Sequence, residues 1–274
     1  MKIMEEEKMT IKLPKDFFFG AAMSGPQTEG AWNVGGRLRS YWDMYSDQEI
    51  NAFFNNVGSY VGNDMYHKYE EDIKLLKSLN FKSFRTSMQW TRLLDQDGKL
   101  NPEGAAWYHK LIDCANENGI DIFMNMYHFD MPEYLVKRGG WQNREVVEAY
   151  ANFVKIAIEE FGDKVKYWLT FNEINNTLNV INMFGDGTTD EDYKKRLTHL
   201  HYQFVASAKA VKLGHEIDPE NKIGCMLAGA ITYPHTCDPK DMLLNQQTME
   251  ENFWYCGDVQ CFGAYPPFAK RIWK

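Results

Sequence analysis

The residue best placed for acid–base chemistry is Glu173, which ends the apolar segment 168–173 (WLTFNE). Partial burial of a carboxyl favours its protonated form, and a general acid must hold its proton near neutral pH. Glu173 is therefore a candidate general acid. A glutamate in the first turn of a helix, stabilised by the helix dipole, fits the same position, and position alone does not separate the two interpretations.

Three further polar residues stand at or inside apolar segments. Asn172 either binds a ligand hydroxyl or caps the following turn, and His128, in the segment YHFDMP, is either a hydroxyl donor or a histidine satisfied in the core. Arg85 lies in FKSFRTSMQW, and a buried guanidinium needs a carboxylate or several acceptors. It belongs either to a structural ion pair or to a device that orients a catalytic carboxylate.

Five strand patterns precede or contain these residues, at 17–23, 83–90, 122–128, 167–173 and 222–228. Four helical patterns separate these strands. The first is an apolar stripe formed by Met65, Tyr69, Ile73, Leu76 and Leu79. The other three run from the cap Asn101-Pro102 to Gly119, from the cap Asn143 to Gly162, and from Leu197 to near Gly214. Such strand–helix alternation predicts an α/β protein with a parallel sheet. The acidic run 70–72 and the pair Asp238-Pro239 are interpreted as a solvated face and a loop.

Two architectures fit this alternation, a doubly wound sheet and a (β/α)8 TIM barrel. Gly20, Gly25 and Gly30 lack the G-x-G-x-x-G spacing of a dinucleotide-binding sheet. In a barrel the chemistry lies at the C-terminal strand ends, where Gln27, His128 and Asn172-Glu173 fall after the first, third and fourth strands. The sequence thus favours a TIM barrel of which about the first five βα units are present.

Composition limits the other classes of protein. The chain has 274 residues, a net charge of −8 and no block of Lys or Arg, which disfavours a nucleic-acid partner. It lacks a run of about 18 apolar residues, so a membrane span is not expected. The five cysteines form no C-x-x-C pair, and His199 and His201 do not share a helix face, so we expect reduced thiols in the cytoplasm and neither metal nor cofactor. Residues 1–10 are predicted to be a disordered extension, and 11–274 the incomplete barrel domain.

From about residue 11 to its end, the sequence resembles glycoside hydrolase family 1. The segments that carry the resemblance are FFFGAAMSGPQTEGAW, FRTSMQWTRLL, YHFDMP and YWLTFNEINN, while residues 214–266 are similar to the 6-phospho-β-glucosidase branch. The resemblance implies that Glu173 is the acid/base, that Asn172, Gln27 and His128 bind the sugar, and that Arg85 orients the nucleophile. Phe129, which stands where other members usually have Trp, again resembles the phospho branch and is expected in the substrate site.

The resemblance implies a retaining β-glycosidase that acts on a β-glucoside or 6-phospho-β-glucoside. The TENG-type nucleophile motif and the phosphate-binding loop of that branch do not occur in these residues. We therefore expect a truncated chain, inactive alone, that requires its C-terminal complement or self-association as a homo-oligomer. Glu29 and Asp130 lie near relevant strand ends, but nothing in the sequence points their carboxylates at an anomeric carbon as the nucleophile. One alternative is a non-catalytic sugar-phosphate-binding half-barrel; another is an inverting hydrolase that pairs Glu173 with an acid within these residues.

Overall fold

The computed structural model describes residues 12–48, 53, 55, 57–179, 189–229 and 231–274, so the predicted extension at 1–10 lies outside the described residues. A five-stranded parallel sheet with the order β1-β2-β3-β4-β5 forms the centre of the chain. The strands are β1 (Gly20–Ala22), β2 (Ser83–Ser87), β3 (Asp121–Asn125), β4 (Tyr167–Leu169) and β5 (Lys222–Gly224). The parallel sheet expected from the sequence is confirmed, and its strands lie side by side in the order in which they occur along the chain.

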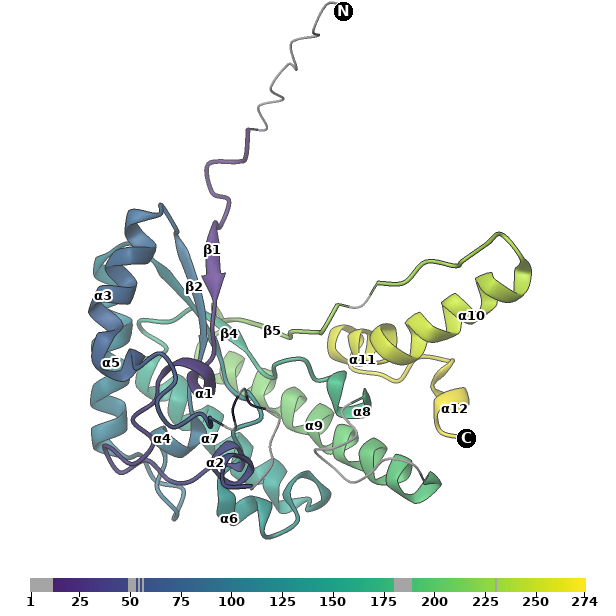
Figure 1. Ribbon diagram of the computed structural model, residues 1–274, viewed down its shortest axis with the longest axis horizontal. Coiled ribbons are helices and arrows are strands. Elements are labelled where there is room, and N and C mark those ends of the chain that lie inside the picture. The colour runs from purple at the N-terminus through teal and green to yellow at the C-terminus, as the bar shows by residue number, and fades with distance from the viewer. Residues whose placement is uncertain (1–11, 49–52, 54, 56, 180–188, 230) are drawn as a thin grey trace, which may run out of the picture.

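The long helices that connect the strands pack on one face of this sheet (Figure 1). They are α3 (Met65–Ser78), α5 (Pro102–Glu117), α7 (Glu145–Phe161) and α9 (Asp190–Ile217). Short helices occupy the loops that follow the strands: α1 (Gly25–Thr28), α2 (Tyr41–Ser46), α4 (Trp90–Leu93), α6 (Glu133–Val136), η2 (Gly140–Gln142) and α8 (Asn176–Asn179). After β5 the chain forms α10 (Pro239–Met249), the π-helix η4 (Glu250–Trp254), α11 (Tyr255–Phe262) and α12 (Ala269–Ile272).

Side-chain caps mark the starts of α2, α5, α9 and α10. Asn101 caps α5 by accepting a hydrogen bond from the backbone N–H of Glu103, with Pro102 as the first helical residue. The sequence predicted an end of α9 near Gly214, and the helix continues slightly further, to Ile217. Gly214 lies against β5, since a Cβ added there would come within 2.2 Å of Cδ1 of Ile223, and that side chain would have to move.

The pair Asp238-Pro239 was expected to be a loop, and the structure corrects this. The Asp238 side chain accepts a hydrogen bond of 2.8 Å from the backbone N–H of Lys240, and Pro239 is the first residue of α10. An N-cap side chain followed by proline at the first helical position therefore begins a helix here, as Asn101-Pro102 does for α5.

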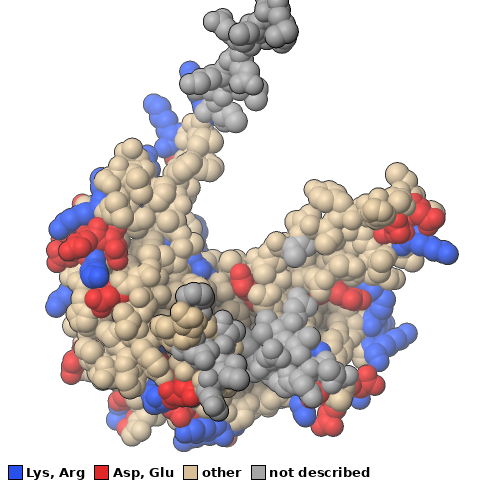
Figure 2. Space-filling model, viewed as in Figure 1, with Lys and Arg blue, Asp and Glu red and all other residues tan. Residues whose placement is uncertain are grey.

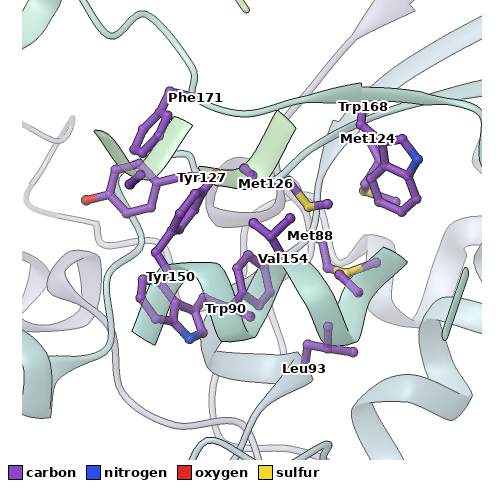
Figure 3. Packing of buried hydrophobic residues seen from close by; sticks show 14 of the residues in the cluster. Met88, Trp90, Leu93, Met124, Met126, Tyr127, Tyr150, Val154, Trp168 and Phe171 are labelled. Carbon is purple, nitrogen blue, oxygen red and sulfur yellow. The ribbon is translucent and has the colours of Figure 1, made fainter. Parts of the chain in front are cut away.

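The core lies between the sheet and its helices. Alternate strand residues Phe84, Ile122, Met124 and Trp168 are buried on the helical face. Figure 3 shows Met124 and Trp168 close to Met88, with Tyr150 and Val154 of α7 in the same cluster. This buried layer fixes the strand register, because a slip by one residue would turn every apolar side chain to the other face.

The opposite face of the sheet is only partly covered. In register across β2, β3 and β4 lie Arg85, Phe123 and Tyr167, all partly exposed, and the ring of Phe18 packs edge-on to Phe123 and Tyr167 at 5.5 Å. Strands β1 and β5 are the two edges. Figure 2 shows an open notch between the β1 side and the arm that carries α10. A (β/α)8 barrel closes this face with further strands, so the chain forms a partial barrel.

Candidate active site

The loop after β4 places Glu173 in a left-handed conformation with φ of 46°. Its carboxylate is partly exposed and accepts a hydrogen bond of 2.7 Å from Nδ2 of Asn176, the first residue of α8. Among the residues that the structure describes, Glu173 has no salt bridge. A non-glycine residue held at positive φ costs about 1–3 kcal/mol, and such strain persists mainly where a site requires it.

Arg85 and Asn172 meet beside Glu173. Nη2 of Arg85 donates a hydrogen bond of 2.6 Å to Oδ1 of Asn172, and Nη1 donates to the carbonyl oxygen of Met23 at 3.2 Å. Burial lowers the pKa of Arg85, while the negative charge of Glu173 acts in the opposite direction. Three of the predicted residues thus form one polar cluster, in which Arg85 from the middle of β2 meets Asn172 and Glu173 of the loop after β4. Arg85 makes no salt bridge within the described ranges, so the structural ion pair considered for it is not observed.

Gln27 and His128 line one hollow of about 260 Å³ together with Trp42. Gln27 is exposed in α1, and its Oε1 accepts a hydrogen bond of 2.7 Å from Oγ of Ser24. Nε1 of Trp42 donates to the carbonyl oxygen of His128 at 3.1 Å. The structure therefore brings together two predicted ligand-binding residues and adds an aromatic ring that the sequence analysis did not single out.

The imidazole of His128 is largely buried, and its Nδ1 has no hydrogen-bond partner among the described residues. Burial, and secondly the positive charge of Arg85, lowers the pKa of His128 to about 3. The ring is therefore neutral at physiological pH. A buried nitrogen without a partner costs free energy unless a ligand or water satisfies it, which fits a hydroxyl-binding role.

The low pKa of His128 predicts a dependence of stability on pH. Below a pH of about 6.5, His128 is protonated in the unfolded chain but remains neutral in the folded protein. The free energy of unfolding should therefore decrease as the pH falls toward 4. Urea denaturation between pH 4 and 7 should show this slope, and it should be shallower in His128→Gln. An unchanged slope in the variant would contradict the buried, neutral imidazole. Asp130 contributes in the opposite direction, but it is present in both proteins.

Phe129 was expected in the substrate site, and the structure places it on an adjoining pocket. Its backbone is left-handed, with φ of 61°. Its side chain lines an apolar pocket of about 230 Å³ with Tyr41, Met131 and Trp141, and does not line the hollow of Gln27 and His128. The ring centroids of His128 and Phe129 are 5.8 Å apart, so the two pockets are neighbours.

Glu29 was considered for the role of the attacking carboxylate, and its surroundings are those of a structural residue. It is buried, and Nε of Arg92 lies 2.8 Å from its Oε2. Nε2 of Gln89 and the hydroxyl of Tyr108 donate to the same carboxylate at 2.7 and 2.8 Å. The Glu29 carboxylate is thus buried and held by Arg92, Gln89 and Tyr108, which is the environment of a structural ion pair and disfavours attack on an anomeric carbon.

Asp130 has a comparable structural role. Its carboxylate accepts hydrogen bonds from the backbone N–H groups of His128 and Trp90 at 3.0 and 3.1 Å. Burial raises the pKa of Asp130 to about 6, against the lowering effect of these N–H donors. Asp130 therefore joins the loops after β2 and β3 and positions His128, which removes support from the inverting alternative.

Across the described ranges, no group of three or more His, Cys, Asp or Glu side chains is arranged to hold a metal ion. No helix in the described part of the chain is long and apolar enough to cross a membrane.

The sheet has parallel strands in sequence order with helices on one face, and polar residues gather at the C-terminal ends of its strands. This arrangement is that of a (β/α)8-barrel protein. The model of glycosyl hydrolase family 1 matches residues 9–274, and the chain belongs to this family.

Individual relatives and solved structures are consistent with this family assignment. The chain is 39% identical to aryl-phospho-β-D-glucosidase BglH of Bacillus subtilis (strain 168), over 95% of its own length and 57% of the relative's. It is 35% identical to 6-phospho-β-glucosidase AscB of Escherichia coli (strain K12), over 95% and 59%. The solved family 1 β-glucosidase from Thermotoga maritima superposes with a TM-score of 0.86 at 30% identity, covering 96% of this chain and 60% of that one. The chain thus spans well under two thirds of these relatives.

Proposed function

We propose that the chain is the N-terminal part of a retaining 6-phospho-β-glucosidase in which Glu173 is the general acid/base. The observation that carries the proposal is the cluster between β2 and the loop after β4, where the partly exposed Glu173 lies beside Arg85 and Asn172. The relatives named as phospho-β-glucosidases support the substrate class. Free thiols at all five cysteines fit a reducing compartment such as the cytoplasm.

In this mechanism, Glu173 donates its proton to the glycosidic oxygen while a second carboxylate attacks the anomeric carbon. The bond to the leaving group breaks and a glycosyl–enzyme ester forms. Glu173, now ionised, then removes a proton from water, which attacks the anomeric carbon and releases the sugar. The proposal assigns the second carboxylate and the phosphate ligands to a part of the enzyme that these residues do not include.

The remaining residues are assigned to binding and positioning. Gln27 and His128, which line one hollow, bind hydroxyls of the non-reducing sugar, and Trp42 offers an aromatic face beside them. Asn172 binds the 2-hydroxyl and is held by Arg85. The guanidinium of Arg85 has further N–H groups, and with these it orients the nucleophile. Phe129 forms an apolar wall next to His128.

The chain alone should not turn over p-nitrophenyl β-glucoside 6-phosphate, since the proposal assigns no residue of these 274 to the attacking carboxylate. Co-expression with the three remaining βα units of a family 1 phospho-β-glucosidase should restore turnover, and the same pair with Glu173→Gln should remain near background when the leaving group is an unactivated alcohol. Release of nitrophenol and of sugar 6-phosphate provides the two readouts. Turnover by the chain alone at the level of an intact relative would refute this division of the site. Saturable binding without turnover in the complemented complex would favour the non-catalytic alternative.

A further inference from the structure

The side chain of Asn175, two residues after Glu173, is buried and paired with main-chain groups from two distant parts of the chain. Its Nδ2 donates to the carbonyl oxygens of Ala228 and Asn252 at 3.0 and 2.8 Å. Its Oδ1 accepts from the backbone N–H of Ala228 at 2.9 Å. One amide therefore fastens the loop after β4 to the segment after β5 and to the π-helix η4, which lie 53 and 77 residues further along the chain.

The π-helix η4 that receives this side chain belongs to the arm that carries α10 and α11 (Figure 1), and it contacts α8. In η4 the backbone N–H of Tyr255 donates to the carbonyl oxygen of Glu250, five residues earlier. Such turns are rare and occur frequently at functional sites. The carboxylate of Glu250 is itself held by Arg271 of α12 at 2.6 Å and by Gln246 of α10 at 2.9 Å. Asn175 is thus bound to a helix whose own position is fixed by its neighbours.

The backbone of Glu173 needs such support. Its φ of 46° lies in the left-handed region, which a non-glycine residue keeps only where the surrounding structure enforces it. The backbone N–H of Asn176 donates to the carbonyl oxygen of Glu173 at 2.8 Å, and Nδ2 of Asn176 donates to the Glu173 carboxylate at 2.7 Å. Asn175 therefore anchors the chain between the strained glutamate and the residue that holds both its backbone and its carboxylate.

The two ends of the same loop have anchors of their own. The backbone N–H of Asn172 donates to the carbonyl oxygen of Tyr127 at 2.9 Å. The hydroxyl of Thr177 donates to Oε1 of Gln203 in α9 at 2.8 Å. Within the described ranges, the hydrogen bonds that join residues 173–176 to parts of the chain beyond this loop and α8 all come from Asn175. The middle of the loop, where the carboxyl lies, thus depends on this one side chain.

From these contacts we infer that Asn175 is a positioning residue, which holds the loop after β4 so that the carboxyl of Glu173 reaches the glycosidic oxygen. The inference rests on the proposed acid/base role of Glu173. Without the Asn175 amide, the carbonyl oxygens of Ala228 and Asn252 lose their donor, and the strained backbone of Glu173 can relax. Proton transfer requires hydrogen-bonding distance between the carboxyl and the leaving oxygen, so a small displacement of the carboxyl slows it.

The test compares two leaving groups in the barrel completed by co-expression. Asn175→Ala should lower kcat for a 6-phospho-β-glucoside with an alkyl leaving group by about 10- to 100-fold, and for the dinitrophenyl glycoside by less than about threefold. A dinitrophenolate leaves without a proton, so a loss confined to the alkyl substrate reports a misplaced acid. A merely structural role would lower the amount of folded enzyme and reduce both rates by the same factor.

Asn101→Ala is the matched control for the loss of a buried asparagine. Nδ2 of Asn101 also donates to two backbone carbonyl oxygens, those of Gly35 and Arg92, at 2.7 and 2.9 Å. Its Oδ1 accepts from the backbone N–H of Glu103 at 3.3 Å. Because Asn101 caps α5 and has none of its printed hydrogen bonds in the loop after β4, its loss should reduce the two rates by the same factor.

A second measurement uses the chain by itself and requires no activity. Hydrogen–deuterium exchange of the backbone N–H groups of Asn176 and Thr177 reports local opening of the loop, because these groups donate to the carbonyl oxygens of Glu173 and Ile174. Asn175→Ala should speed this exchange by at least about tenfold, while the amides of β4 keep their wild-type rates. Asn101→Ala should leave the exchange of both loop amides unchanged.

The outcomes separate this inference from the proposed function. Equal losses on the two substrates in Asn175→Ala, with an alkyl-specific loss in Glu173→Gln, would overturn the positioning role and leave the acid role intact. Equal losses in Glu173→Gln would remove the acid role and, with it, the inference. Wild-type exchange of the loop amides in Asn175→Ala would overturn the inference whatever the rates of turnover.

Discussion

In an enzyme that carries the complete barrel, Glu173→Gln should lower kcat for a 6-phospho-β-glucoside with an alkyl leaving group by about 10²- to 10⁴-fold, the usual contribution of general acid catalysis. An alkoxide is a poor leaving group and needs the proton, whereas a dinitrophenolate leaves without it. Cleavage of the dinitrophenyl glycoside should therefore lose far less. The glutamine keeps the size of the side chain and can still contact Asn176.

Glu159→Gln is the matched control, since Glu159 is an exposed glutamate of α7 that pairs only with Lys155 at 3.8 Å among the described residues. It should leave both rates unchanged. Initial rates with the two leaving groups, measured for wild type and both variants, give the comparison. Equal losses on alkyl and dinitrophenyl substrates in Glu173→Gln would argue that the residue supports the fold or binding and does not transfer a proton.

The second large effect is on stability. Arg92→Met should lower the free energy of unfolding by about 3–5 kcal/mol, because it leaves the buried carboxylate of Glu29 without its cation. Both side chains are almost wholly inaccessible, and the guanidinium also lies 4.6 Å from the ring centroid of Tyr66. Urea denaturation followed by circular dichroism measures the change.

Lys155→Met provides the control for the loss of a cation. Its partner Glu159 is exposed, so the change in unfolding free energy should stay within about 0.5 kcal/mol. If Arg92→Met cost less than about 1 kcal/mol, the cluster around Glu29 would not be the structural centre described here, and a chemical role for Glu29 would regain support.

Much of the fold follows from local sequence patterns. Strand and helix periods predicted the parallel order, and the signal at Asn101-Pro102 predicted the start of α5. The same kind of signal at Asp238-Pro239 was misinterpreted because no apolar stripe follows it: Met242, Leu243 and Leu244 are each more than half exposed. A cap without a buried face is hard to distinguish from a turn in sequence alone.

The sequence predicted the positions of those candidate site residues that directly follow a strand. Glu173, Asn172, His128 and Gln27 were expected there because parallel strands end at one edge. The hydrogen bond between Arg85 and Asn172 joins residues 87 positions apart, and no local pattern encodes it. The same holds for Trp42 beside His128 and for Arg92 beside Glu29, which depend on tertiary packing. Phe129 has a left-handed backbone and lines a separate pocket, and no local pattern predicts either feature.

The most direct test of the central claim is the pH dependence of kcat/KM in the complete enzyme, with and without Glu173→Gln. If this carboxyl delivers the proton, the wild type should show a bell-shaped profile whose alkaline limb reports loss of that proton, and the limb should vanish in the variant. An alkaline limb that persists at the same pH in Glu173→Gln would show that another group is the acid, and the account of the site would be wrong.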